Sequence, residues 1–285
     1  IITSLVSTKS PQEMKLLLID PKMVELSVFE DIPHLWAPII SDPKRAALVL
    51  EWLTKEMDER YQLFNKVRVM KIDTYNQLEK DELQKRLKDA GVPPEQIESI
   101  PPLLPYIVVI IELADLMMVA GRDVEMSIIR LSQKARAVGI HLVAATQRPS
   151  ADVVTGLIKS NMTSRIAFKV VSNIESKIIL DTKGAERLLG KGDMLLLMPG
   201  QHAPIRAQCT YVSENEIANL CTFLKSLGEP QYHNAIIEIE QEGALEGSPD
   251  DELFDEAVRI VVESRRGSIS LLQREMKIGY QRAAR

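Results

Sequence analysis

The stretch Leu104–Met118, LPYIVVIIELADLMM, brings a β-branched apolar run directly up to Glu112. The run Pro105–Ile111 does not alternate between polar and apolar residues, which is typical of a strand covered on both faces at the centre of a parallel sheet. In such sheets, ligands bind outside the carboxyl ends of the strands. We therefore predict that Glu112 lies at the functional edge of the sheet. An isolated run of this kind would favour the simpler alternative, a strand that merely ends at a solvated Glu.

The composition limits the class of protein. The 285 residues are 45% hydrophobic, 26% charged and 5% aromatic, which suits an α/β protein with one large core and a small additional domain. The net charge of −5 argues against a uniformly basic surface, although a basic channel remains compatible with it. Two cysteines, Cys209 and Cys221, favour a reducing compartment, and the four histidines show no metal-ligand spacing.

Further strands and helices are predicted on both sides of the central run. A strand at Leu16–Ile19 ends at Asp20-Pro21, and Asp42-Pro43 caps a helix over Lys44–Phe64. The polar stretch Lys66–Pro102 predicts an insertion or a mobile connection. The later elements alternate in a βαβ layout, with these expected bounds: helix Val124–Val138, strand Ile140–Ala145, strand Arg165–Val171, helix Ile174–Leu180 and strand Met194–Met198.

The C-terminal part changes from an acidic segment to a basic one. Residues 229–249 combine Gly, Pro and Ser with glutamates and predict a solvated acidic linker. From Ser264 to Arg285 six cations face a single acid. The pattern of helix, break, helix, turn and helix is typical of a helix-turn-helix, whose last helix enters the major groove. It predicts Gln281 and Arg282 as base readers and Arg285 as a phosphate contact.

Seven blocks, in this order, resemble the motor and C-terminal domains of the FtsK/SpoIIIE family of bacterial DNA translocases: IDPKMVELS, ELADLMM, QKARAVGIHLVAATQRPS, TGLIKSN, SRIAF, GAERLLGKGDML and SISLLQREMKIGYQRAAR. The resemblance implies a RecA-like P-loop ATPase core with a mainly parallel central sheet over residues 1–228. An acidic linker, 229–249, and a small winged-helix (helix-turn-helix) DNA-binding domain, 250–285, would follow it.

The resemblance also implies what the protein does. It implies a homo-hexameric ring that uses ATP and Mg²⁺ to move double-stranded DNA in chromosome segregation at cell division. A site-specific recombinase is an expected partner of the C-terminal domain. The family carries a membrane anchor upstream, so the chain would be the cytoplasmic domain of an inner-membrane-anchored protein.

The sequence departs from the family pattern in two places. The phosphate-binding loop of the family, G-x-x-x-x-G-K-[ST], is expected in residues that precede Ile1. Family members also usually have an Asp directly before the Glu of the central strand, where Ile111 stands here. Either this protein has lost that Asp or the sequence omits one residue there, and we favour the omission.

Roles for single residues follow from the chemistry of ATP hydrolysis and from the resemblance. Glu112 is predicted to orient or deprotonate the attacking water. Gln147 is predicted to sense the nucleotide and couple hydrolysis to movement; its alternative role is to cap a turn. The resemblance suggests that Arg136 is an arginine finger toward a neighbour's nucleotide, with Arg165 as the runner-up. The alternative role of Arg136 is to satisfy the terminal carbonyls of its own helix.

Three further cations are predicted to contact the phosphates of duplex DNA: Arg148, Lys159 and Lys177. Each of them alone would be read as a solvated surface charge. Asn173 stands where a basic residue is common in the family.

Two other classes of protein fit parts of the sequence. A nucleotide-binding module with a degenerate site would fit the missing Asp and would fail to hydrolyse ATP. A conjugation-type ATPase that pumps DNA out of the cell shares the motor but is not expected to carry the SISLLQREMKIGYQRAAR tail. The tail therefore favours the translocase.

Overall fold

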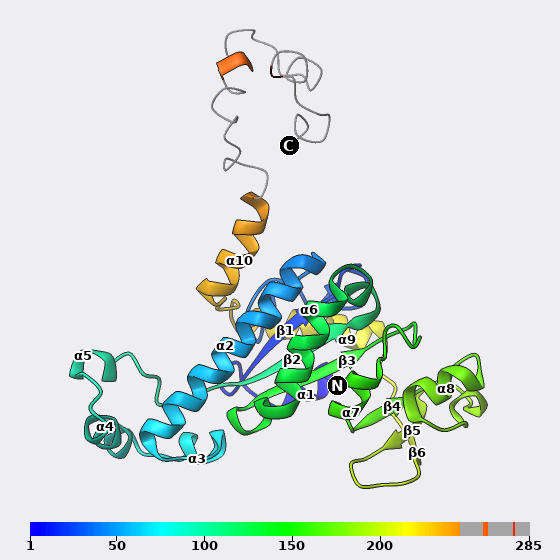
Figure 1. The fold of residues 1–285 in the computed structure, drawn as a ribbon, viewed down its shortest axis with the longest axis horizontal. Helices are drawn as coiled ribbons and strands as arrows, with labels where there is room; N and C mark the ends of the chain where they lie inside the picture. Colours follow the sequence, from blue (N-terminus) through cyan, green and yellow to red (C-terminus); the bar gives the residue numbers. More distant parts are fainter. Residues whose placement is uncertain (246–258, 262–275, 277–285) are drawn as a thin grey trace. The chain divides into compact units, whose positions relative to one another are not determined.

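The computed structural model describes residues 1–245, 259–261 and 276. The chain divides into two units, Ile1–His233 and Asn234–Arg285, each of which is described by itself. The first unit contains two three-stranded sheets (Figure 1).

The central sheet is parallel, in the order β1-β2-β3. Its strands are β1 (Met14–Ile19), β2 (Tyr106–Glu112) and β3 (Ile140–Ala145). The five residues of β2 between Tyr106 and Glu112 are all buried, as expected for a strand covered on both faces. The prediction of a central parallel strand that ends at Glu112 is confirmed.

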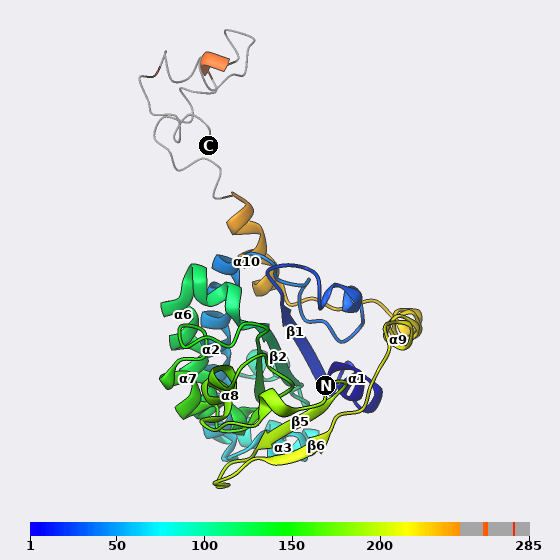
Figure 2. The same cartoon turned by 90° about the vertical axis from the view of Figure 1, so that its right-hand side faces the viewer.

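Helices cover both faces of this sheet. Figure 2 shows α2 (Pro43–Val67) and α6 (Leu113–Lys134) on one side and α1 (Ile2–Thr8) and α9 (Glu214–Leu227) on the other. The remaining helices of the first unit are η1 (Ser27–Phe29), α3 (Ile72–Asn76), α4 (Lys80–Asp89), α5 (Pro94–Ile97), η2 (Ala135–Val138), α7 (Gly156–Asn161), α8 (Asn173–Leu180) and η3 (Ala185–Arg187).

Helix α2 follows the prediction closely. The Asp42 carboxylate accepts the backbone N–H of Arg45 at 2.9 Å, and Pro43 occupies the first turn. The helix continues three residues past Phe64 and ends at Arg68, whose φ is 55°. Its apolar face packs against α6.

Helix α6 begins eleven residues earlier than expected, at Leu113 instead of Val124. The residues that follow Glu112, LADLMMVA, are mostly strong helix formers, so the helix starts as soon as the strand ends. Ala120, before Gly121, departs from helical geometry (φ −129°, ψ 31°) without ending the helix. Glu112 is therefore both the last residue of β2 and the residue that precedes α6.

The expected βαβ layout is wrong for the second half of the first unit. Strands β4 (Arg165–Ala167), β5 (Asp193–Leu197) and β6 (Ile205–Gln208) form a separate antiparallel sheet. The connection between β5 and β6 is too short for a parallel crossover, which needs a dozen or more residues. This sheet and α8 share a small core of their own, made of Ala167, Leu180, Ala185 and Leu188.

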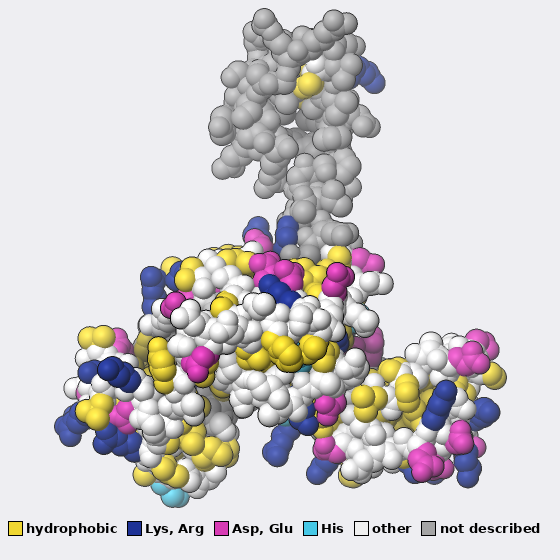
Figure 3. Space-filling view, turned by 180° about the vertical axis from the view of Figure 1, so that it is seen from behind, with side chains coloured by type: hydrophobic (Ala, Val, Ile, Leu, Met, Phe, Trp, Pro, Cys, Tyr) yellow, Lys and Arg dark blue, Asp and Glu magenta, His cyan; other side chains and the backbone are white. Residues whose placement is uncertain are grey.

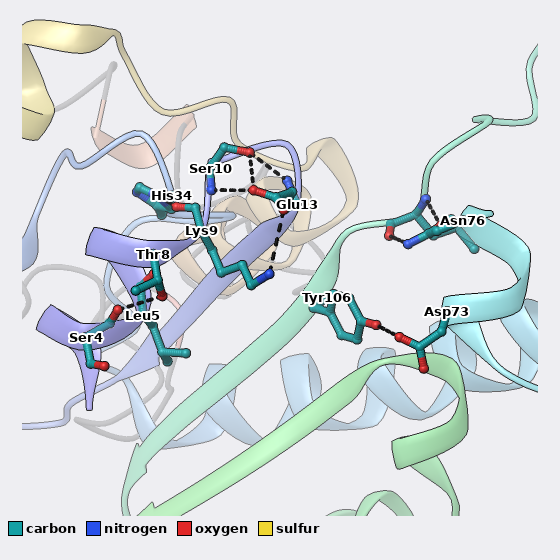
Figure 4. Close-up of polar contacts among 11 residues, drawn as sticks. Ser4, Leu5, Thr8, Lys9, Ser10, Glu13, His34, Asp73, Asn76 and Tyr106 are labelled. Atoms are coloured by element: carbon teal, nitrogen blue, oxygen red, sulfur yellow. Dashed lines mark hydrogen bonds and ion pairs between the residues drawn. The ribbon is translucent and has the colours of Figure 1, made fainter.

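The insertion before β2 is fixed to the rest of the unit, so the expectation of a mobile connection is not met. Tyr75 stacks on Phe64 with ring centroids 5.5 Å apart, and its hydroxyl donates to the Pro101 carbonyl at 2.7 Å. The side chain of Asn76 donates to the carbonyl of Leu104 and accepts its N–H, each at 2.9 Å (Figure 4). The start of β2 is thereby anchored.

The second unit departs from the predicted linker. Helix α10 spans Asn234–Leu245, inside the segment 229–249. Ala, Ile and Glu dominate this stretch, and they favour helix over an extended tether. The predicted winged-helix segment 250–285 lies almost wholly outside the described residues, as do its predicted base readers Gln281 and Arg282 and its phosphate contact Arg285.

Gly139 is a position where any side chain would be strained. Its φ is 79°, and a Cβ there would lie 2.4 Å from Cδ1 of the buried Ile72 and 3.3 Å from Cδ1 of Tyr106. Gly91 has a φ of 77° with open space around it. We expect Gly91→Ala to destabilise the chain by roughly 1–2 kcal/mol through backbone strain alone. Gly139→Ala should cost about 1–3 kcal/mol more, because Ile72 must move.

Urea unfolding of the two variants measures this difference. Equal losses of unfolding free energy would show that the packing around Gly139 accommodates a methyl group.

Candidate functional site

Polar residues follow the end of each strand of the central sheet. Asp20 comes directly after β1, Glu112 ends β2, and Gln147 lies two residues beyond β3. The parallel register pairs Ile19 with Ile111 and Glu112 with Ala145. These side chains therefore meet at one edge of the sheet, where ligands of parallel sheets bind.

Glu112 has an unusual electrostatic environment. Partial burial raises the pKa of its carboxyl, and the nearby backbone N–H groups of Ala114 and Gln147 oppose that effect. The charges of Glu25 and Asp115 raise the pKa further. A half-buried carboxylate with a raised pKa is suited to accept a proton from water.

Gln147 lies beside this carboxylate. Its side-chain amide donates a hydrogen bond to the Glu25 carboxylate, and its backbone N–H lies near Glu112. Gln147 thus joins the loop after β3 to two acids at the sheet edge. A turn-capping side chain would bond to backbone within its own turn, whereas Gln147 bonds to Glu25, in the loop after β1.

The loop after β1 is built around a buried carboxylate that sequence analysis did not single out as functional. Asp20 is fully buried and accepts four backbone N–H groups at 3.0–3.2 Å, from Lys22, Val24, Glu25 and Leu26. These bonds fold the loop back on itself and hold Lys22 and Glu25 at the sheet edge. The signal that could have found Asp20 is the one that found Glu112, an acid directly after a buried strand.

Asp115 was also missed, because the predicted helix began after it. It lies in the first turn of α6, and its Oδ2 is 3.0 Å from Nζ of Lys22. That oxygen is buried and makes no hydrogen bond of good geometry. Glu25, Glu112 and Asp115 thus place three carboxylates near a single ammonium, a balance that favours a bound cation.

The site fits Mg²⁺ only together with other ligands. Among the described residues, no three His, Cys, Asp or Glu side chains converge as a metal site. Ile111 is fully buried between Ile19 and Ala144 and offers no ligand atom. Mg²⁺ usually binds through one or two carboxylates, substrate phosphates and water. The carboxylates at this edge match the protein's share of such a set.

Arg136 lies at the opposite end of β3 from Gln147. It sits on η2, directly before the strand, so the length of β3 places it roughly 20 Å from the site edge. The side chain is exposed and has no hydrogen bond or ion pair with any described residue. The carbonyls at the end of α6 and in η2 are satisfied by other donors, among them the N–H groups of Ala135 and Gly139. The alternative role for Arg136, that of capping its own helix, is therefore not observed.

Two predicted residues are held by a shared acid. Lys159 Nζ lies 2.7 Å from Oδ1 of Asp181, and Arg165 Nη1 lies 2.5 Å from Oδ2 of the same carboxylate. Both cations lower the pKa of Asp181. Arg165 also donates to the carbonyls of Ile179 and Lys159, at 3.2 and 3.1 Å. The donors of Arg165 are thus used within its own chain, and Lys159 is already paired with an acid, unlike a solvated lysine.

The antiparallel sheet and α8 form a lobe, residues 165–208, on which positive charge is exposed. Its acids are engaged within the lobe and by Lys159: Glu175 accepts the N–H of Val171, Asp181 pairs with Arg165, Glu186 accepts the N–H of Gly184, and Asp193 pairs with Arg206. Four exposed lysines have no ion pair with a described residue: Lys169, Lys177, Lys183 and Lys191. In Figure 3 dark blue side chains gather on this lobe, at the lower left. Arg148, after β3, is also exposed.

Comparison with known proteins identifies related sequences. A family model described as "FtsK/SpoIIIE family" matches residues 1–151, and one described as "Ftsk gamma domain" matches residues 248–285. The chain is 48% identical over 290 residues to DNA translocase FtsK of Sporosarcina ureae, covering 100% of this chain and 35% of that protein. It is 48% identical over 286 residues to DNA translocase SpoIIIE of Bacillus subtilis (strain 168), with the same two coverages. The chain therefore spans about a third of the length of these relatives.

Solved structures share the fold. The pCW3 conjugation coupling protein TcpA, in a monomer form with ATPgS, has a TM-score of 0.56 at 23% identity, over 76% of this chain and 57% of that chain. EssC (ATPases 2 and 3) from Geobacillus thermodenitrificans has a TM-score of 0.60 at 15% identity, over 81% of this chain and 42% of that chain. With the family match, these likenesses confirm the expected P-loop ATPase fold class. In the part of the chain that the structure describes, every helix is too short or too polar to span a bilayer.

The raised pKa of Glu112 predicts a pH-dependent gain in stability on its replacement. Folding favours the neutral form of this carboxyl, so its ionisation at pH 7 lowers stability. We expect Glu112→Gln to raise Tm at pH 7, by roughly 2–4 °C for each kcal/mol gained. The gain should fade as the pH falls below the ordinary value of 4.5, because the carboxyl is then neutral in both states.

Glu13→Gln is a control of opposite sign. Hydrogen bonds from the backbone and side chain of Ser10 lower the pKa of Glu13, so its replacement should lower Tm at pH 7 and matter less in acid. Calorimetry from pH 3.5 to 8 tests both variants. A Tm change for Glu112→Gln that is independent of pH would refute the electrostatic assignment.

Proposed function

The chain belongs to the FtsK/SpoIIIE family, and on that basis we propose that it is the motor of an ATP-driven double-stranded DNA translocase that acts in chromosome segregation. The observation that carries the proposal is the position of Glu112. It is a half-buried carboxylate with a raised pKa at the carboxyl edge of a parallel sheet, beside Gln147.

Hydrolysis divides its tasks among the residues of this edge. Bound ATP would supply the phosphoryl group, and Mg²⁺ held with the help of the carboxylates of this edge would neutralise charge on its oxygens. Glu112 orients the attacking water and accepts its proton. Asp115 and Glu25 lie where a cation would relieve the crowding of negative charge. The residues of the phosphate-binding loop would complete the site.

Gln147 is suited to report the state of the nucleotide. Its amide is held by Glu25, so a cation that attracts Glu25 or a phosphate that repels it would release the amide. Arg148 follows directly and is exposed. A change at Gln147 therefore reaches a DNA-contacting residue through a single peptide bond.

Arg136 is proposed to act in a neighbouring subunit. It points into solvent at the edge opposite to Glu112 of its own chain, so it cannot serve that site. A ring in which each subunit turns this edge toward the next one's nucleotide would place Arg136 against the γ-phosphate. We propose a homo-hexamer for this ring.

Duplex DNA is the proposed partner of the exposed cations. Arg148 and Lys177 are free to contact phosphates, and the other lysines of the lobe extend the same positive surface. Lys159 can do so only in competition with Asp181. We also propose that residues 250–285 form a winged helix that reads DNA with Gln281 and Arg282, holds phosphate with Arg285, and serves a recombinase partner. The anchor in the inner membrane would lie in other parts of the whole protein.

One observation favours a second function. Ile111 is buried and apolar at the position where the family resemblance implies an Asp in most members, which would suit a nucleotide-binding module that no longer hydrolyses ATP. A conjugation-type pump receives no such support, because the likeness to the coupling protein TcpA shows the fold alone.

The trans role of Arg136 is tested by mixing two inactive variants of the full-length protein. We expect Glu112→Gln and Arg136→Ala each to lower ATP turnover on the order of 10²-fold or more. Rings that contain both should recover part of the activity, because some interfaces then pair an intact Glu112 with an intact Arg136. Arg130→Ala, an exposed arginine on α6 that pairs with Asp58, is the control and should retain near-normal turnover.

Two results would speak against this assignment. Mixed rings that form, as shown by co-purification, but stay inactive exclude a trans finger. Undiminished hydrolysis by Glu112→Gln would remove the catalytic role of that residue.

The DNA-contact role of Lys177 is tested by the salt dependence of binding. Lys177→Ala should weaken the binding of any duplex and reduce the slope of log K against log salt by about 1. Lys159→Ala should have a smaller effect, because Asp181 already neutralises that lysine. Lys55→Ala removes the same charge from α2, where Lys55 pairs with Glu51. A change of slope in Lys55→Ala as large as that in Lys177→Ala would mean that only the net charge matters.

A further inference from the structure

The turn that carries Arg136 is tied at both ends to two adjacent residues of α2. The hydroxyl of Tyr61 donates to the carbonyl of Lys134, directly before the turn, at 2.7 Å. The guanidinium of Arg60 donates through Nη1 to the carbonyl of Val138, the last residue of the turn, at 2.9 Å. A single helix thus fixes where η2 begins and ends.

Arg60 is a buried charge whose Nε and Nη1 groups both have partners. Its side chain is 3% exposed, and Nε lies 2.7 Å from the carboxylate of Glu56. Nη1 also donates to the carbonyl of Pro105, directly before β2, at 2.9 Å. A buried ion is stable only when it is paired and hydrogen-bonded. Arg60 therefore has one position, and through it α2, the start of β2 and the turn have fixed relative positions.

Gly139 completes the restraint. Its N–H donates to the carbonyl of Arg136 at 3.2 Å, and its own carbonyl accepts the N–H of Ile107 from β2 at 2.8 Å. Figure 4 shows Tyr106, which borders Gly139, hydrogen-bonded to Asp73 of the insertion. The backbone on either side of Arg136 is therefore held firmly.

The side chain of Arg136 contrasts with its backbone. It is exposed and has no hydrogen bond or ion pair with any described residue. A restrained backbone under a free guanidinium is the arrangement expected of a group that is presented to something outside the chain. An arginine that served only the fold would use its donors within the chain, as Arg60 and Arg165 do.

We infer that Arg60 and Tyr61 are positioning residues for Arg136, and that they set where its guanidinium stands in the neighbouring subunit's nucleotide site. The inference rests on the proposed trans role of Arg136. It extends to the chain's own site, because Arg60 holds the start of the strand that Glu112 ends. Helix α2 thus helps to position both Glu112, which would act in its own subunit, and Arg136, which would act in the neighbouring one.

Tyr61→Phe is the informative variant, because it removes one hydroxyl and leaves the ring. Arg60→Ala would leave Glu56 without its partner and remove three contacts. A loss of turnover in that variant could therefore come from lower stability as well as from a displaced Arg136. Tyr75→Phe is the matched control: its hydroxyl also donates to a carbonyl at 2.7 Å, but that carbonyl belongs to Pro101 of the insertion and not to η2.

ATP turnover of the full-length protein gives the first readout. Tyr61→Phe should lower kcat about 2–5-fold, the effect of one weakened hydrogen bond, with KM unchanged. Tyr75→Phe should leave kcat unchanged. The double variant Tyr61→Phe/Arg136→Ala should be no slower than Arg136→Ala alone, because the hydroxyl acts only through the arginine.

Amide hydrogen exchange gives a second readout that needs no nucleotide. The N–H of Gly139 reports the turn, because it donates to the Arg136 carbonyl. Its exchange should become faster in Tyr61→Phe and stay unchanged in Tyr75→Phe.

The outcomes separate the inference from the proposed function. Normal turnover in Tyr61→Phe, or losses that multiply in the double variant, would overturn the positioning role while leaving the trans finger in place. Normal turnover in Arg136→Ala alone would remove the finger itself, and the positioning role with it.

Discussion

The parallel register of three short strands is the constraint on which the rest of the site depends. Because β1, β2 and β3 run the same way, the residues that follow them are brought to one edge from positions far apart in the sequence. The same register sends Arg136, which precedes β3, to the opposite edge. A single subunit thus carries an acid on one edge and an exposed arginine on the other, and the proposed trans role of Arg136 would make them parts of two different sites.

Sequence reasoning found the parts of this site that depend on one local pattern. A β-branched run that ends in an acid identified Glu112, and the polar tip of the next strand identified Gln147. It missed Asp115, whose position at the sheet edge depends on a helix that starts directly after the strand, which periodicity does not show. It also missed Asp20, where the Asp-Pro pair was interpreted only as the end of a strand. The antiparallel sheet was not predicted, because short strands with no repeating pattern do not show which strands they pair with.

Charge was the property least predictable from sequence. The chain as a whole is acidic, yet the lobe of residues 165–208 exposes positive charge, because its carboxylates are used by backbone N–H groups and arginines. Composition counts a carboxylate that is paired with an arginine and one in solvent alike, whereas the paired one repels a phosphate less. Lys159 shows the converse. It was predicted to contact DNA phosphates, and Asp181, a residue with left-handed backbone geometry, pairs with it in a way that sequence spacing does not predict.

These features together bear on how neighbouring sites of a ring could stay in step. The strand β2 is anchored at its start by Arg60 and by Asn76, and Glu112 lies at its end. A strand in the middle of a sheet is stiff along its length, so a displacement at Glu112 is transmitted to the end that Arg60 holds. Arg60 in turn holds the turn of Arg136. In the proposed ring, this buried ion and this strand would connect Glu112 of one nucleotide site to the arginine proposed for the next.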